Sequence, residues 1–95
     1  MTKQQTIAII KQYLRKYPIS RVSLFGSFAR NQQDSESDID LLIQFNETID
    51  FFTLANIRQD LCEKTKRQVD IVTEKSLSEK FRSRIQGDLQ VIFEA

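Results

Sequence analysis

Two aspartates with one residue between them, Asp38 and Asp40, stand at the start of an apolar run in the segment SDIDLLIQF. Successive side chains of a strand point to opposite faces, so a strand here carries both carboxylates on one face, with Cα atoms about 6.5–7 Å apart. Carboxylates at that separation repel, and the pKa of each rises unless a positive charge lies between them. The spacing therefore indicates a divalent cation. Mg²⁺ suits the pattern because it binds through one or two carboxylates together with water and substrate phosphate oxygens.

A third carboxylate, Asp70, lies inside the otherwise apolar segment VDIV. An ionised side chain in such a segment needs a partner. If its strand lies beside the strand of Asp38 and Asp40, the three can hold two metal ions about 3.5–4 Å apart, which bind the attacking and leaving oxygens of a phosphoryl displacement. We therefore take Asp38, Asp40 and Asp70 as candidate catalytic residues and metal ligands, with Mg²⁺ expected and Mn²⁺ as the alternative. The simpler interpretation is a solvated strand end and an edge strand.

A glycine–serine pair, Gly26 and Ser27, precedes the aspartates. Glycine allows a ligand to approach the backbone closely, and amides at the start of a following helix attract anions. The hydroxyl of Ser27 adds a donor. The pair can therefore hold a phosphate that faces a metal bound by Asp38 and Asp40, although a Gly-Ser pair alone is more often an ordinary turn.

The elements that must position these residues alternate between helical and strand patterns. Apolar spacing predicts helices over residues 2–17, 51–66 and from Ser76 to Gly87, and one or two helical turns after Ser27. Strands are predicted over 19–25, 38–45, 68–73 and 89–94. Capping boxes of Thr2 with Gln5 and of Ser76 with Glu79 begin two of the helices, Pro18 ends the first, and Gly87 can close the last. The order indicates a mixed α/β (α+β) fold in one domain, residues 1–95.

Composition narrows the possible chemistry. The chain has 95 residues and no histidine, which removes Ser-His and Cys-His dyads and most zinc sites. Cys62 is the only cysteine, so no disulfide can form within the chain and a reducing cytoplasm is expected. Fourteen basic and 13 acidic residues give a formal charge of +1, which argues against nucleic-acid binding through bulk charge. The apolar run near the N-terminus is too short for a membrane span, so no membrane association is expected.

Together, the motifs GSFAR, SDIDLLI and VDIV resemble the minimal nucleotidyltransferases of the DNA polymerase β superfamily. The resemblance covers nearly the whole chain and implies a nucleotidyltransferase fold, with a mixed four-stranded sheet and helices packed against it. It implies Asp38, Asp40 and Asp70 as the metal-binding carboxylates and Gly26 and Ser27 as the nucleotide-phosphate turn. The family usually has glycine where this chain has Asn31.

Two further residues of these motifs are candidates for nucleotide binding. Ser37 opens the Ser-Asp-x-Asp motif. Arg30 either helps to hold the nucleotide or pairs with a carboxylate of the site, and the sequence favours neither role.

The family resemblance and the small size of the chain imply an antitoxin that transfers AMP from ATP to a tyrosine of a HEPN-type toxin. A different class of function is a binding module that neutralises the toxin by contact, with nucleotide only as a ligand. Retention of three aspartates favours the enzyme, because masking needs no carboxylate cluster. Nucleotidyl transfer to RNA is a weaker alternative, for which local basic patches are available at Arg15, Lys16 and Arg21 or at Lys80, Arg82 and Arg84.

Overall fold

The computed structural model describes residues 1–30 and 38–95. Its elements, in chain order, are α1 (Lys3–Leu14), β1 (Ile19–Phe25), α2 (Gly26–Ala29), β2 (Ile39–Phe45), α3 (Phe51–Thr65), β3 (Val69–Thr73), the 3₁₀ turn η1 (Glu74–Ser76), α4 (Glu79–Ile85), the 3₁₀ turn η2 (Gln86–Asp88) and β4 (Gln90–Glu94). The expected strands all form, within one residue at either end. The mixed α+β fold class is confirmed.

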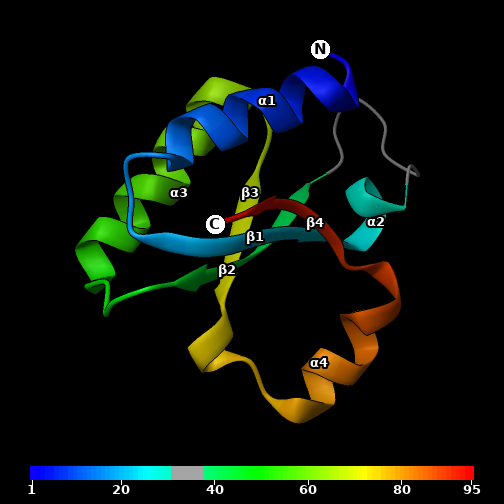
Figure 1. Ribbon diagram of the computed structural model, residues 1–95. Helices are drawn as coiled ribbons and strands as arrows, with labels where there is room; N and C mark the ends of the chain where they lie inside the picture. Colours follow the sequence, from blue (N-terminus) through cyan, green and yellow to red (C-terminus); the bar gives the residue numbers. More distant parts are fainter. Residues whose placement is uncertain (31–37) are drawn as a thin grey trace.

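The strands form one mixed sheet in the order β3-β2-β1-β4 (Figure 1). Strand β1 pairs antiparallel with both β2 and β4, whereas β2 and β3 are parallel. A parallel pair needs a crossover connection, which α3 provides between β2 and β3. The two strands of the second half of the chain, β3 and β4, therefore form the two edges of the sheet.

Helices α1 and α3 cover one face of this sheet (Figure 1). Alternation along the strands directs the apolar side chains of every second residue to that face, so that Val22 and Leu24 of β1 lie in the core with Leu41 and Ile43 of β2.

No helix in the described parts of the chain has both the length and the apolar character needed to cross a membrane.

The opposite face carries a smaller apolar cluster beneath α4. Phe25, Leu42 and Ile85 are buried there. The ring of Phe81 meets that of Phe25 edge to face, with centroids 5.9 Å apart. Because Phe25 directly precedes Gly26, this cluster supports the end of β1 from which the glycine–serine pair begins.

The start of α1 is as expected, but its end comes earlier. Thr2 and Gln5 form the predicted capping box. The helix ends at Leu14 rather than Tyr17, because a residue that precedes proline disfavours the helical conformation. The ring of Tyr17 still packs on that of Tyr13, with centroids 5.7 Å apart.

The predicted ends of the last helix were wrong. Helix α4 begins at Glu79, and its N-cap is Ser78, whose side chain accepts a hydrogen bond from the backbone N–H of Phe81. The other serine, Ser76, lies in η1, and its hydroxyl donates instead to the carbonyl of Thr73. Gly87 does not close α4 in a left-handed conformation but lies in η2, which follows the helix directly.

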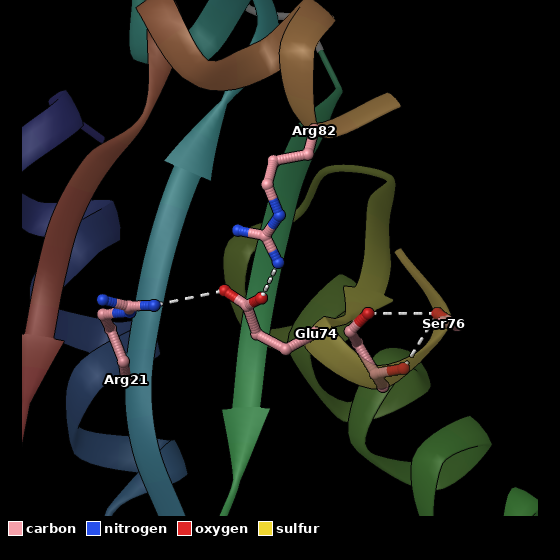
Figure 2. Close-up of polar contacts among 5 residues, drawn as sticks. Arg21, Glu74, Ser76 and Arg82 are labelled. Carbon is pink, nitrogen blue, oxygen red and sulfur yellow. Dashed lines mark hydrogen bonds and ion pairs between the residues drawn. The ribbon is translucent and has the colours of Figure 1, made fainter. Parts of the chain in front are cut away.

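An acidic residue, Glu74, connects the sheet to α4 on this second face (Figure 2). One of its carboxylate oxygens lies 3.3 Å from Arg21 of β1 and the other 2.5 Å from Arg82 of α4. The Glu74 side chain is only 14% exposed. Charge-assisted hydrogen bonds to a carboxylate shielded in this way stabilise more than an open surface ion pair does.

We expect Glu74→Gln to lower the free energy of unfolding by about 1–2 kcal/mol, because both ion pairs lose their charge while the two arginines stay partly solvated. In a domain of this size the melting temperature then falls by roughly 4–8 °C per kcal/mol. Glu94→Gln is the matched control: Glu94 also pairs with Arg21, but at 3.8 Å and with a side chain that is 62% exposed. Similar thermal melts for the two variants would contradict this role for Glu74.

Candidate functional site

Three candidate carboxylates gather where β2 and β3 begin. Asp38 directly precedes β2, and Asp40 is its second residue. The parallel pairing of β2 with β3 sets Asp40 opposite Asp70 in the ladder. The strand of Asp70 therefore lies beside the strand of Asp40, as a site of all three carboxylates requires. The side chains of Asp40 and Asp70 leave these neighbouring strands on the same face of the sheet.

Gly26 lies against this acidic group. It follows Phe25, which is paired with Asp40 across β1 and β2. The φ angle of Gly26 is +77°, a conformation that other residues rarely adopt. A Cβ atom at this position would overlap Oδ2 of Asp40 and lie 3.4 Å from its Cγ. Both the backbone angle and the space therefore require glycine beside the Asp40 carboxylate.

Electrostatics at the site disfavour a charged Asp40. Partial burial raises the pKa of this carboxyl above its usual range, and the charges of Asp70 and Asp38 raise it further. A cation among the three would reverse this effect, because it favours the ionised form. The three carboxylates are therefore candidate ligands of a cation.

The surroundings of Asp70 agree with the simpler interpretation of its segment, an edge strand. Strand β3 is at the edge of the sheet, and the Asp70 side chain is 55% exposed rather than enclosed by its apolar neighbours. Its nearest cationic partner is Arg58 of α3, at 3.8 Å, whose Nε also donates to the carbonyl of Val69. Sequence reasoning missed Arg58, because only the crossover brings this helix position beside the start of β3.

The remaining candidates lie at or beyond α2. Ser27 follows Gly26 in α2, so the helical segment predicted after Ser27 begins earlier, at Gly26, and ends at Ala29. The guanidinium of Arg30 lies 2.6 Å from Asp88 of η2, which is not one of the three site aspartates. The predicted role of Arg30 in nucleotide binding stays a prediction. Ser37 and Asn31 lie outside the described residues, so their predicted contribution stays a prediction.

The donor set fits a divalent ion bound together with a substrate better than a complete protein cage. Within residues 1–30 and 38–95, no three carboxylate, cysteine or histidine side chains are arranged to hold a metal ion by themselves. Asp40, packed against a required glycine and flanked by Asp38 and Asp70, offers hard oxygen ligands. Mg²⁺ accepts one or two such ligands and completes its shell with water and phosphate oxygens.

The raised pKa of Asp40 predicts a pH-dependent stability of the metal-free protein. Between the unfolded and folded pKa values the folded state binds more protons, so this carboxyl contributes less stability as pH rises through that window. With EDTA at pH 7, Asp40→Asn should therefore melt at or above the temperature of the wild type. The difference should shrink below about pH 4, where the carboxyl is neutral in both states.

Thermal melts of both proteins between pH 3.5 and 8 measure this difference, with Glu63→Gln, an exposed position on α3, as control. A strongly lowered melting temperature of Asp40→Asn at pH 7 would show instead that the carboxylate has a stabilising partner.

Comparison with known proteins agrees with the geometry. Residues 8–95 match the family model described as "Polymerase beta, Nucleotidyltransferase". A Methanocaldococcus jannaschii protein named as a candidate protein adenylyltransferase is 38% identical over 72 residues, which cover 76% of this chain and 77% of the relative. A second protein of that organism with the same designation is 33% identical over 94 residues, covering 90% of this chain and 96% of the relative.

Solved structures share the fold. A minimal nucleotidyltransferase superposes with a TM-score of 0.79 at 26% identity, covering 95% of each chain. An MNT antitoxin in complex with a tri-AMPylated HEPN toxin of Shewanella oneidensis gives a TM-score of 0.81 at 21% identity, covering 99% of this chain and 74% of that one. The sequence matches, the sheet order and the acidic site lead to one conclusion: this chain belongs to the polymerase beta nucleotidyltransferase family and is a nucleotidyltransferase.

Proposed function

We propose that this nucleotidyltransferase transfers AMP from ATP to a tyrosine hydroxyl of a HEPN-type toxin and thereby acts as its antitoxin. Relatives named as protein adenylyltransferases support AMP as the transferred group and a protein as the acceptor. The solved complex of an MNT antitoxin with an AMPylated HEPN toxin supports the class of partner. A related toxin–antitoxin structure with AMP-PNP supports ATP as the nucleotide.

The observation that carries the proposal is the placement of Asp40. It is paired with Asp70 across parallel strands and packed against a glycine that no other residue can replace without strain. A carboxylate pair of this kind has little structural value, because its charges repel each other. Its value would be catalytic: Asp40 would hold Mg²⁺ with Asp38 and Asp70, and Gly26 and Ser27 would receive the nucleotide phosphates.

In the proposed reaction, the acceptor oxygen attacks the α-phosphorus of ATP. The bond between the α-phosphorus and the oxygen that bridges it to the β-phosphorus breaks, and pyrophosphate leaves. The proton of the acceptor hydroxyl passes to Asp70 or to water. Asp38 and Asp40 would hold Mg²⁺, with Asp70 as the third ligand of a two-ion site. When bound, the ions neutralise charge that develops on the attacking and leaving oxygens. Ser27 and Gly26 would orient the phosphates.

We expect intact-mass spectrometry to show that a HEPN-type partner gains AMP units on co-expression with the wild-type chain. Asp38→Asn and Asp40→Asn should abolish the gain, because they remove transition-state stabilisation worth several kcal/mol, while the complex with the partner persists. Glu63→Gln is the matched acid-to-amide control, since it lies on the helix that covers the opposite sheet face.

The same experiment separates the alternatives. An unmodified partner that is equally inhibited by wild type and both aspartate variants would replace transfer with neutralisation by contact. If label from ATP appears on RNA instead of protein, RNA replaces the partner protein as the acceptor. Modification that requires ATP and a divalent metal, tested by EDTA and Mg²⁺ or Mn²⁺ addition, supports the proposed reaction.

The two glycines of this chain provide a second test. Gly26→Ala introduces a strained φ angle, costing about 1–2 kcal/mol, and displaces the Asp40 carboxylate, so AMP transfer should fall at least ten-fold. At Gly87 an added Cβ meets nothing within 4 Å, so Gly87→Ala should leave transfer unchanged and the melting temperature unchanged or slightly raised. Transfer rates and thermal melts of the pair measure this. Equal activity in the two variants would remove the Gly26–Asp40 contact from the mechanism.

A further inference from the structure

The C-terminal end of α2 is tied to two segments that are distant in sequence. The ammonium group of Lys3 donates to the carbonyl of Ala29 at 3.2 Å and to the side chain of Gln90 at 3.1 Å. Arg30, the C-cap of α2, pairs with Asp88 at 2.6 Å. Segments from both ends of the chain therefore meet at this short helix.

Helix α2 depends on such contacts for its position. It has only four residues, the side chain of its N-cap residue Phe25 makes no capping hydrogen bond, and isolated helices of this length are not stable in water. Phe28 is completely buried and anchors the middle of the helix. The backbone N–H of Arg30 donates to the carbonyl of Gly26 at 3.2 Å. This hydrogen bond links Arg30 to the glycine that lies against Asp40.

We propose that Asp88 is a positioning residue for the Gly26–Ser27 turn, acting through the Arg30 guanidinium. The inference rests on the proposed function, because it assumes that this turn receives the nucleotide phosphates. It gives Arg30 a different task from direct nucleotide binding: its side chain holds the end of α2 against η2, and its backbone holds Gly26.

The exposure of the pair separates this role from a purely structural one. The side chains of Arg30 and Asp88 are 43% and 26% exposed. Ion pairs with that access to solvent contribute little to overall stability. Small displacements of a phosphate-binding turn, in contrast, strongly affect nucleotide binding and transfer. Loss of Asp88 should therefore affect nucleotide affinity far more than melting temperature.

A double-mutant cycle tests the proposal with Asp88→Asn, Arg30→Gln and the double variant. Calorimetry gives the affinity for ATP with Mg²⁺, and thermal melts report the fold. Each single variant should weaken ATP binding roughly 3- to 30-fold, the range typical of coupled neighbours, and the double variant should lose no more than either. Backbone hydrogen exchange at residues 26–30 should accelerate in Asp88→Asn. Glu94→Gln, an acid of the same C-terminal segment that pairs with Arg21, should leave ATP affinity unchanged.

Three outcomes would overturn the proposal. Additive losses, with Arg30→Gln much the weaker binder, would show that Arg30 contacts the nucleotide itself. Unchanged ATP affinity in Asp88→Asn would leave the pair as a surface contact, and a lowered melting temperature with unchanged affinity would make it structural. The cycle measures ATP binding and not transfer, so a wild type that binds ATP but modifies no partner would overturn the proposed function and leave this inference standing.

Discussion

The parallel pairing of β2 with β3 is the constraint on which the site depends. It sets Asp40 beside Asp70 at one level of the sheet, where burial and neighbouring charge both oppose ionisation of Asp40. Natural proteins hold such an arrangement at a cost to stability, and functional sites are where that cost is expected. Gly26 adds to it, since its left-handed backbone brings β1 close to the same carboxylate. The acidic end of the sheet is thus locally destabilised, and under the proposed function a bound cation would relieve this repulsion.

The rest of the fold compensates for this local cost. The larger apolar core between the sheet and helices α1 and α3 fixes the strand register, and a register shift would turn the aspartates to the wrong face. The smaller cluster around Phe25 supports the second face. Glu74 holds α4 to that face through two arginines, so the sheet surface beside the site is covered by a segment that arrives late in the chain.

The C-terminal segment consequently has two tasks in one stretch of sequence. Residues of α4 complete the apolar cluster, while Asp88 of η2 reaches the end of α2. Polar contacts thus connect α2 to the C-terminal segment of the chain. In a domain with few residues to bury, positioning by such long-range ion pairs complements a limited core.

The sequence by itself determined the strand positions to within one residue, because strand alternation is a local property of neighbouring residues. It predicted Gly26 and Ser27 as a turn, whereas in the structure they are the first two residues of α2. The start of the first helix was also readable from Thr2 and Gln5. The start of α4 was not, because Ser76 and Ser78 are both residues that suit an N-cap and the structure has Ser78 there. Only the tertiary structure decided that β3 is an edge strand, that Arg58 lies near Asp70, and that Asp88 pairs with Arg30. These partners are separated by 12 to 58 positions, and no local pattern encodes them, because they meet only when the crossover and the C-terminal segment pack on the sheet.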